Sequence, residues 1–222
     1  MEGYYGVGRT TARQSVALLR AEGLVITEHG RGTYVRPRLP VRRLSGERYR
    51  ADRDQIGDGQ PPATSFTKDQ GIGWSEYRLD RTFTEIPATP ELAELLAVPE
   101  GTPILERRFT FHTVDGPQQM STSCYPLELV AGTPVADPAN EPWPGGNLAQ
   151  LATLGITVTK VTERVRARMP MPDEMAALDI PAGVPVITVT RVMLAGERPV
   201  EAAVDIVIPA DRVELNYTID LD

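Results

Sequence analysis

The sequence has one cysteine, Cys124, and no apolar run close to the roughly 20 residues that cross a bilayer. A single cysteine excludes an internal disulfide framework. The opening residues, MEGYYGVGRT, lack the apolar stretch of a secretory signal. Hydrophobic residues make up 41% of the chain, which excludes a disordered tail. We therefore expect a cytoplasmic protein with an ordinary apolar core.

Catalytic motifs are also missing. The sequence contains no HExxH, GxSxG or phosphate-loop pattern and only two histidines, His29 and His112. Cys124 has no histidine beside it in the sequence. Asp173 and Glu174 stand at a predicted helix start, where the helix dipole accounts for both. We predict that the chain is not an enzyme and needs no metal or cofactor.

Charge is divided unevenly along the 222 residues, whose net charge is −7. Residues 1–53 carry 11 arginines against 5 acidic residues, whereas residues 54–222 carry a net charge of −13. A basic front on an acidic body indicates that the first part alone meets a polyanion such as nucleic acid. A chance bias of the surface is the alternative, and charge by itself does not decide between them.

The basic front has the pattern of a helix followed by a hairpin. In RTTARQSVALLRAEG, Ala12, Val16 and Leu19 share one side at helical spacing, and Gly23 is a typical helix stop. LVITE, HGRG and TYVR then predict a strand, a tight turn and a second strand. A helix followed by a hairpin with a basic tip is the second half of a winged helix-turn-helix. The alternative is a generic amphipathic helix whose arginines are merely solvated.

These residue types suit DNA. A helix fits the major groove, and its first turn offers amide groups and a positive dipole end to a phosphate. Thr10 and Thr11 add hydroxyl donors, while Arg13 and Gln14 reach base edges or backbone. Arg31 at the hairpin tip is placed to enter a minor groove.

The remainder of the chain contains a linker and a weak internal repeat. Residues 38–63 are rich in Arg, Pro, Gly and Asp and predict a linker, with one short strand near 39–44. TPELAELLAVPEGTPI (89–104) aligns with MPDEMAALDIPAGVPV (171–186) at an offset of 82. Each copy predicts a polar strand, a short helix, a P-x-G-x-P turn and two further strands, at 77–86, 103–112 and 117–125, and at 158–168, 185–194 and 199–208.

The repeat predicts the fold class. Tight hairpins imply antiparallel pairing, so we expect an α+β body with a sheet of about six strands and helices over one face. PWPGGNLAQLATLG, between the copies, predicts a loop and a helix near 148–154. The expected domains are a partial winged helix-turn-helix (1–37), a linker (38–63) and a sensor body (64–222).

The segment VGRTTARQSVALLRAEGLVITEHGRGTYV resembles the signature of the GntR family of bacterial transcription regulators. Gly8 stands where that family usually has serine, which removes an N-cap hydroxyl. The resemblance implies these DNA contacts: Arg9, Thr10, Thr11, Arg13 and Gln14 from the recognition helix, and Arg31 and Gly32 from the wing.

The family's domain normally starts earlier, with a first helix and an LPSERxLA-type second helix, where this sequence has only MEGYYGVGRT. Without those helices the apolar side of the recognition helix has little to pack on, and a lone short helix is marginal in water. Two explanations stay open: a misassigned start, or a truncated regulator with weakened DNA binding.

Residues 80–212 resemble the UTRA domain, the ligand-binding partner of the HutC subfamily, on segments such as ATPELAELLAVPEGTPILERRFTF, DGPQQMSTSCYP and RPVEAAVDIVIPADR. The resemblance implies a chorismate-lyase-like antiparallel sheet, a small-molecule site and dimerisation. Arg107 and Arg108 alternate faces on a central strand, so one of them points inward, where it would suit an anionic group. The alternative is a surface salt bridge.

Three more residues complete the expected effector site. Ser123 and Tyr125 share a strand face and offer hydroxyls, or simply fill the strand. Glu201 stands where many UTRA domains place a ligand-binding glutamate; its alternative is a solvated carboxylate. Two residues that UTRA domains often have are absent: a glutamate near Ser121, and an arginine at the position where this sequence has Phe109. We therefore expect a ligand less like a sugar phosphate, or a more apolar pocket.

Together these features predict a homodimeric repressor that binds near-palindromic double-stranded DNA and is released by a small, anionic effector. Activation is an alternative outcome of effector binding. A second alternative is a truncated ligand-binding protein that has lost independent DNA binding.

Overall fold

The structure, a computed structural model, describes residues 4, 6–28, 30–35, 41–44, 47–54 and 63–217. Its N-terminal part consists of the helix α2 (Arg9–Ala21) and the antiparallel strands β1 (Val25–Glu28) and β2 (Gly32–Val35). Helix α2 ends at Ala21, and Gly23, just after the C-cap Glu22, has a φ of +68°, which a residue with a side chain rarely adopts. The predicted helix and hairpin are both present, although His29 of the turn lies outside the described residues.

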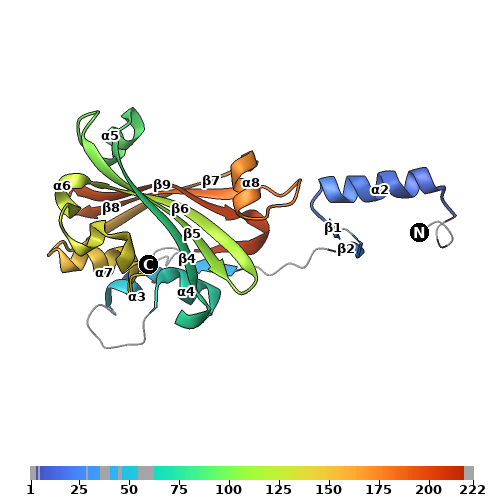
Figure 1. Cartoon of the computed structure of the whole chain (residues 1–222), viewed down its shortest axis with the longest axis horizontal. Coiled ribbons are helices and arrows are strands. Elements are labelled where there is room, and N and C mark those ends of the chain that lie inside the picture. The colour runs from blue at the N-terminus through green and yellow to red at the C-terminus, as the bar shows by residue number, and fades with distance from the viewer. Residues whose placement is uncertain are drawn as a thin grey trace, which may run out of the picture.

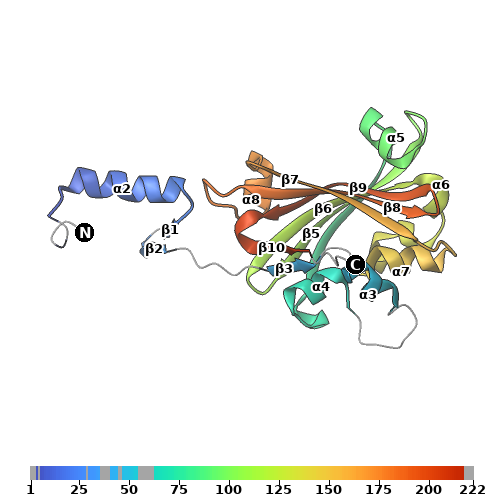
Figure 2. The ribbon, with the colours of Figure 1, turned by 180° about the vertical axis from the view of Figure 1, so that it is seen from behind.

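Figures 1 and 2 show the body of the chain, which is built on one twisted sheet of six strands. The strand order is β4-β5-β6-β9-β8-β7, and every neighbouring pair is antiparallel. This confirms the predicted α+β fold with an antiparallel sheet. The strands are β4 (Arg78–Pro87), β5 (Pro103–Thr113), β6 (Gly116–Pro126), β7 (Lys160–Arg168), β8 (Val186–Ala195) and β9 (Arg198–Pro209).

The sequence repeat corresponds to the two halves of this sheet. One half is β4, α5 (Pro90–Leu96), β5 and β6, and the other is β7, α8 (Pro172–Ala177), β8 and β9. The last strands of the two copies, β6 and β9, pair at the centre of the sheet. Gly101 and Gly183, in the two P-x-G-x-P turns, both have positive φ, +77° and +83°. The turn glycines therefore recur because the same backbone shape is built twice.

Helices cover both faces of the sheet, so the expectation of helices on one face was wrong. Leu92 and Leu96 of α5 pack with Ile104 of β5. Leu151 of α7 (Gly146–Thr153) packs with Leu105, the next residue along β5. Adjacent strand residues point to opposite faces, so α5 and α7 lie on opposite sides. The repeat supplies one helix per copy on the first face, and the residues between the copies supply α7 on the second (Figure 1).

The predicted linker contains regular structure that packs on the body. Strand β3 (Val41–Leu44), close to the expected strand, pairs in parallel with β10 (Val213–Asn216). Helix α3 (Glu47–Asp54) follows, and α4 (Ser65–Gln70) begins at a Thr64 cap. Helix α3 was not predicted, because ERYRADRD is almost entirely charged and has no apolar periodicity.

The remaining elements are short. They are α6 (Leu127–Val130) and the 3₁₀ turns Trp74–Glu76, Pro134–Ala136, Pro138–Asn140 and Ala210–Arg212. Within the ranges described above, no helix combines the length and apolar character needed to cross a bilayer.

Candidate functional site

Helix α2 presents its polar side chains to solvent. Arg9, Thr10, Thr11, Arg13 and Gln14 are all exposed, on the first two turns of the helix. Gly8 provides no side-chain cap, so the first amide groups of α2 have no side-chain acceptor at that position. A helix start without a side-chain cap and with arginines beside it is suited to a phosphate.

The opposite side of α2 holds the apolar residues that the spacing predicted. Ala12, Val16 and Leu19 are half-buried, whereas Leu18 is 60% exposed. No residue of α2 is buried. Packing within the described chain therefore adds little to the stability of this helix.

The hairpin tip is shaped by its glycines. Gly30 and Gly32 have φ of +76° and +112°, and Arg31 between them is exposed. The Tyr34 hydroxyl donates a hydrogen bond to the carbonyl oxygen of Arg31. This contact ties the backbone of the tip to β2 and leaves the wing compact.

A cavity of about 100 Å³ lies in the body, between one face of the sheet and the helices α3, α4 and α7. Residues far apart in the sequence, from Arg48 to Ile206, converge on this cavity. Its polar and charged lining comprises Arg48, Asp52, Thr64, Ser65, Gln119, Ser121, Ser123, Glu141, Asn147 and Arg191, and its aromatic lining comprises Tyr49, Phe66, Tyr77, Phe109, Phe111 and Trp143.

Of the two consecutive arginines on β5, Arg107 points inward. Its side chain is 0% exposed, whereas that of Arg108, on the opposite face, is 68% exposed and pairs with Glu106 at 2.8 Å. One inward arginine is what strand alternation predicted. The second alternative, a surface salt bridge, describes Arg108.

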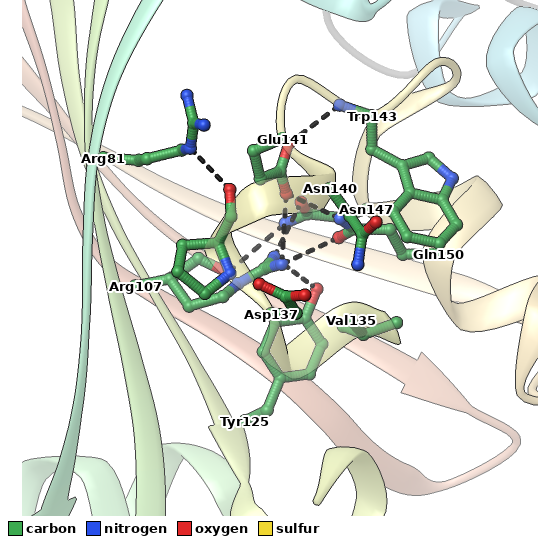
Figure 3. Close-up of polar contacts among 12 residues, drawn as sticks. Arg81, Arg107, Tyr125, Val135, Asp137, Asn140, Glu141, Trp143, Asn147 and Gln150 are labelled. Atoms are coloured by element: carbon green, nitrogen blue, oxygen red, sulfur yellow. Dashed lines mark hydrogen bonds and ion pairs between the residues drawn. The ribbon is translucent and has the colours of Figure 1, made fainter. Parts of the chain in front are cut away.

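Figure 3 shows that Arg107 is held by the protein itself. Its Nη1 donates to Gln150 Oε1 at 2.9 Å and to Glu141 Oε1 at 3.3 Å. Its Nη2 donates to the Tyr125 hydroxyl at 3.0 Å and to Asn147 Oδ1 at 3.2 Å. Glu141 and Asn147 line the cavity, whereas Arg107 lies behind them. Arg107 therefore holds the cavity-lining side chains of Glu141 and Asn147 in place.

The other expected effector residues divide in the same way. Tyr125 is fully buried behind the wall, and burial raises the pKa of its hydroxyl. Ser123 lines the cavity and donates to Glu201 Oε1 at 2.8 Å. Glu201 is 0% exposed, so its alternative as a solvated carboxylate is excluded. Asn147 Nδ2 also donates to Glu201, at 3.0 Å.

Arg191 on β8 is a cavity residue that the sequence analysis missed. Its Nη2 lies 2.7 Å from Glu201 Oε1. Burial opposes its charge, but Glu201 and Tyr49 outweigh burial and raise the pKa of the guanidinium. The repeat carried the signal, since an offset of 82 places Arg191 at the position of Phe109, and both line the cavity.

Arg48 on α3 was also missed, and no pattern in the sequence points to it. Its Nη2 lies 2.9 Å from Asp69 Oδ2, and its side chain is 11% exposed. Its Nε and Nη1 are buried and have no acceptor among the described residues. Nearby, Asp52 accepts hydrogen bonds from Ser65 and from Lys68, the latter at 2.6 Å. These pairs fasten α3 to α4 over the cavity.

Comparison with known proteins assigns both parts of the chain. Residues 3–35 match the gntR family of bacterial regulatory proteins, and residues 81–214 match the UTRA domain. The chain is a GntR-family regulator. Its organisation, a gntR segment followed by UTRA, is consistent with the HutC subfamily. The regulator thus combines a DNA-binding segment with a ligand-sensing domain, in a family that is generally non-enzymatic.

Named relatives agree with this assignment. The regulator is 30% identical over 187 residues to an HTH-type transcriptional regulator of Streptomyces coelicolor. The aligned residues span 82% of this chain and 68% of that protein. It is 33% identical over 131 residues to one from Rhizobium meliloti, of which it covers 46%. The solved structure of a GntR-family regulator superposes with a TM-score of 0.67 at 32% identity. The match covers 100% of this chain and 86% of that chain.

Two more distant structures share the fold. PhnF from Mycobacterium smegmatis has a TM-score of 0.61 at 21% identity, covering 100% of this chain and 89% of that chain. The C-terminal domain of the histidine utilization repressor from Pseudomonas syringae has a TM-score of 0.56 at 22% identity, covering 65% and 99%. At these identities the likeness concerns the fold of the regulator alone.

Proposed function

We propose that this chain is a repressor whose affinity for its operator is controlled by a small molecule bound in the cavity beneath α3. One observation carries the proposal. The cavity wall is shared between the sensor sheet and α3, the helix that follows the DNA-binding segment and β3 along the chain. A ligand in this cavity would touch both parts at once.

The division of labour follows the chain. Residues 1–37 would read DNA, residues 38–63 would connect, and residues 64–222 would bind the effector and dimerise. Two chains would present two α2 helices to the half-sites of a near-palindromic operator, because two-fold symmetry in the protein is matched by two-fold symmetry in the site. A protein that acts on bacterial DNA works in the cytoplasm.

On the DNA, Arg9, Thr10 and Thr11 are proposed to hold phosphates, since they surround the uncapped start of α2. Arg13 and Gln14, one turn further on, are proposed to reach base edges. At the wing, Arg31 would enter the minor groove while Gly32 allows the backbone close to the sugar-phosphate chain.

In the cavity, Ser123 and Arg191 are proposed to touch the effector directly. Arg107, Tyr125 and Glu201 would act as positioning residues, because both Nη atoms of Arg107, the Tyr125 hydroxyl and Glu201 Oε1 already bond to protein groups. Arg108, on the opposite face, would contribute only through its strand.

Effector control would work through α3. This helix is attached by Arg48 to α4 and by Tyr49 to β7, where the Tyr49 hydroxyl donates to Glu163 Oε1 at 2.5 Å. A ligand that binds more tightly to one placement of α3 shifts the population toward that placement. The spacing of the two DNA-binding segments would change with it, and the operator would be released.

The test is binding of the full chain to an operator selected from random DNA, followed by fluorescence anisotropy. We expect salt-sensitive binding to a two-fold symmetric site, weakened by a small molecule that occupies the cavity. Effector-strengthened binding would contradict release of the operator by the effector. Binding to DNA that no cavity ligand alters would overturn effector control.

A second candidate function, a ligand-binding protein without independent DNA binding, is favoured by one observation. No residue of α2 is buried, so little in the described chain holds this helix in place. In the same experiment this candidate predicts ligand binding in the cavity but no operator selected above background.

A further inference from the structure

The C-terminal end of α2 touches the sensor at residues 181–185, the turn that precedes β8 (Figures 1 and 2). Two glycines make this contact. A methyl group on Gly183 would lie 1.7 Å from the carbonyl oxygen of Ala21, and one on Gly23 would lie 2.9 Å from Cγ2 of Val184. Both distances are well inside the roughly 3.5 Å at which non-bonded heavy atoms meet. The two segments can therefore approach this closely only because neither glycine has a side chain.

We propose that residues 181–185 form a seat for the recognition helix, and that Gly183 and Gly23 are positioning residues that fix the spacing of the two half-sites in the operator. The inference rests on the proposed function of the chain as an operator-binding dimer. It gives the sensor a direct contact with the DNA-binding segment, in addition to the connection along the chain.

The shape of the turn requires a glycine at this place, but it does not require the close approach. Gly101 occupies the equivalent place in the first copy of the repeat, with a φ of +77° against +83° for Gly183. Among the described residues, a methyl group on Gly101 would meet no atom within 4 Å beyond its chain neighbours. The two copies share one backbone shape, and only the second copy uses it to receive another segment.

The seat is firmly attached to the sensor. Val184 is 4% exposed and packs in one cluster with Leu178 and Val186. The amide of Ala210 donates a hydrogen bond to the carbonyl oxygen of Pro185 at 2.9 Å. A segment held by core packing and by a backbone hydrogen bond can fix the position of whatever rests on it.

Two further connections join the seat to the parts of the chain that sense and transmit. Arg212 donates to the carbonyl oxygen of Asp179 at 3.1 Å, and it is followed by β10, which pairs with the linker strand β3. Strand β8 begins directly after the seat and carries Arg191 of the cavity wall. A shift of β8 on ligand binding would therefore reach the end of α2 without passing through α3.

The seat leaves the DNA-reading residues uncovered. Arg9 lies about 18 Å and Gln14 about 10 Å along the helix axis from Ala21, and both side chains are exposed. Figure 1 shows α2 running away from the sensor, with its first turns at the far end. A contact that blocked DNA binding would have to cover those turns. The seat instead holds α2 by the end that does not read DNA.

The contact restricts where α2 lies more than it stabilises the helix, since no residue of α2 is buried. In a dimer, a seated helix has a fixed position on its own sensor, so the distance between the two recognition helices is fixed as well. Binding of the first half-site then presents the second helix at a high effective concentration to the second half-site. A helix without its seat ranges more widely, which lowers that concentration and weakens the choice of spacing.

The test compares Gly183→Ala with Gly101→Ala in the full chain. Both variants place alanine at a positive φ, so the backbone strain is matched, and only Gly183→Ala directs a methyl group at α2. Anisotropy titrations use the selected operator, the same half-sites with about two base pairs inserted between them, and a single half-site. We expect Gly183→Ala to lower the ratio of operator affinity to half-site affinity at least about tenfold and to reduce the spacing preference, and Gly101→Ala to change neither.

Gly23→Ala tests the contact from the other side. It should lower the same ratio, because its methyl group meets Val184, and adding Val184→Ala should restore part of the loss. Such a rescue is not expected of a variant that has merely lost stability. Circular dichroism checks that each variant is folded.

Hydrogen exchange of residues 15–24, measured without DNA, reports the seat directly and should be faster in Gly183→Ala than in Gly101→Ala. Equal exchange in the two variants, equal operator ratios, or tighter operator binding by Gly183→Ala would each overturn the inference. If no operator is selected at all, the proposed function fails, and the exchange comparison still decides whether the seat exists. If the spacing preference responds but no cavity ligand alters DNA binding, the seat stands and effector control fails.

Discussion

Arg191 and Glu201 form a buried ion pair across the neighbouring strands β8 and β9, with Nη2 2.7 Å from Oε1. The Arg191 side chain is 12% exposed and that of Glu201 is 0% exposed. Ser123 and Asn147 donate to the same carboxylate. One acidic group thus organises both the cavity wall and the centre of the sheet.

Glu201→Gln should therefore be strongly destabilising. It leaves the guanidinium of Arg191 buried without its counter-charge, which costs about 3 kcal/mol of unfolding free energy. Urea unfolding measures the loss, and Glu197→Gln, an exposed residue in the β8–β9 turn, is the matched control. Replacing both partners, as Arg191→Met with Glu201→Leu, should cost less than the single change. Equal stability of Glu201→Gln and the unmodified chain would contradict the pairing.

Arg107 and Arg108 offer a direct comparison of neighbouring positions. Arg107→Met removes donors from four buried or half-buried partners and should lower the unfolding free energy by about 3 kcal/mol. Arg108→Met removes an exposed pair with Glu106 and should change it by less than about 0.5 kcal/mol. Thermal or urea unfolding of the two variants, side by side, is the measurement. A similar cost for both would mean that Arg107 is not the inward residue.

Tyr49→Phe tests the attachment of α3. The change removes the hydrogen bond to Glu163 while keeping the ring, and should cost about 1 kcal/mol. Under the proposed function it should also reduce the difference in operator affinity with and without effector, because α3 is held less firmly in either placement. Anisotropy titrations measure this difference. Tyr217→Phe, at an exposed tyrosine, should leave both quantities unchanged.

Two substitutions on α2 separate the proposed roles on DNA. Arg9→Ala should weaken binding to all sequences alike and lower the slope of log affinity against log salt by about 1. Gln14→Ala should instead relax the preference at one base position. Arg166→Ala, an exposed arginine on β7 of the sensor, is the control for loss of positive charge. Equal effects of Arg9→Ala and Arg166→Ala would contradict a specific phosphate contact.

Stability should decline at alkaline pH. Burial, followed by the charge of Glu106, raises the pKa of the Cys124 thiol from its ordinary 9.0 to about 12. Between these values the unfolded chain loses the thiol proton while the folded chain keeps it. The unfolded state then binds fewer protons, and unfolding free energy falls as pH rises, by up to about 1.4 kcal/mol per pH unit.

Urea unfolding between about pH 9 and about pH 12 measures this decline, and Cys124→Ala should make it shallower. Part of the decline should persist, because burial also raises the pKa of Tyr77 and Tyr125. At neutral pH, a thiol reagent should react with Cys124 only after unfolding. Rapid labelling of the folded chain would contradict the burial of this residue.

The repeat explains why so much of the sheet was predictable. Prolines and glycines at equivalent places in the two copies marked the same helix start and the same positive-φ turn, and these are local features. The strand ends followed from them within a few residues. The residues that form α7 were predictable from the local sequence too. The sheet face that α7 covers was not predictable, because the connecting residues could place the helix on either face.

The cavity was only partly predictable. Strand alternation required one of Arg107 and Arg108 to point inward. The fold selected Arg107, because the acceptors Gln150 Oε1 and Glu141 Oε1 lie on its face of the sheet. Arg48 could not be found at all, because a charged stretch of linker composition gives no sign that it will close over a sheet. Arg48 lines the cavity only because other segments bring Asp69, its ion-pair partner, and the aromatic lining residues next to it.

The sequence by itself determined the two-part plan of this regulator, the doubled antiparallel sheet and the basic, amphipathic character of α2. Each of these depends on residues close together in the chain, where spacing and turn chemistry act directly. The tertiary structure alone decided which arginine is buried, which carboxylate pairs with it and which rings meet in the cavity. Those outcomes depend on desolvation and packing between segments more than a hundred residues apart, as with Arg48 and Arg191, and no local pattern encodes them.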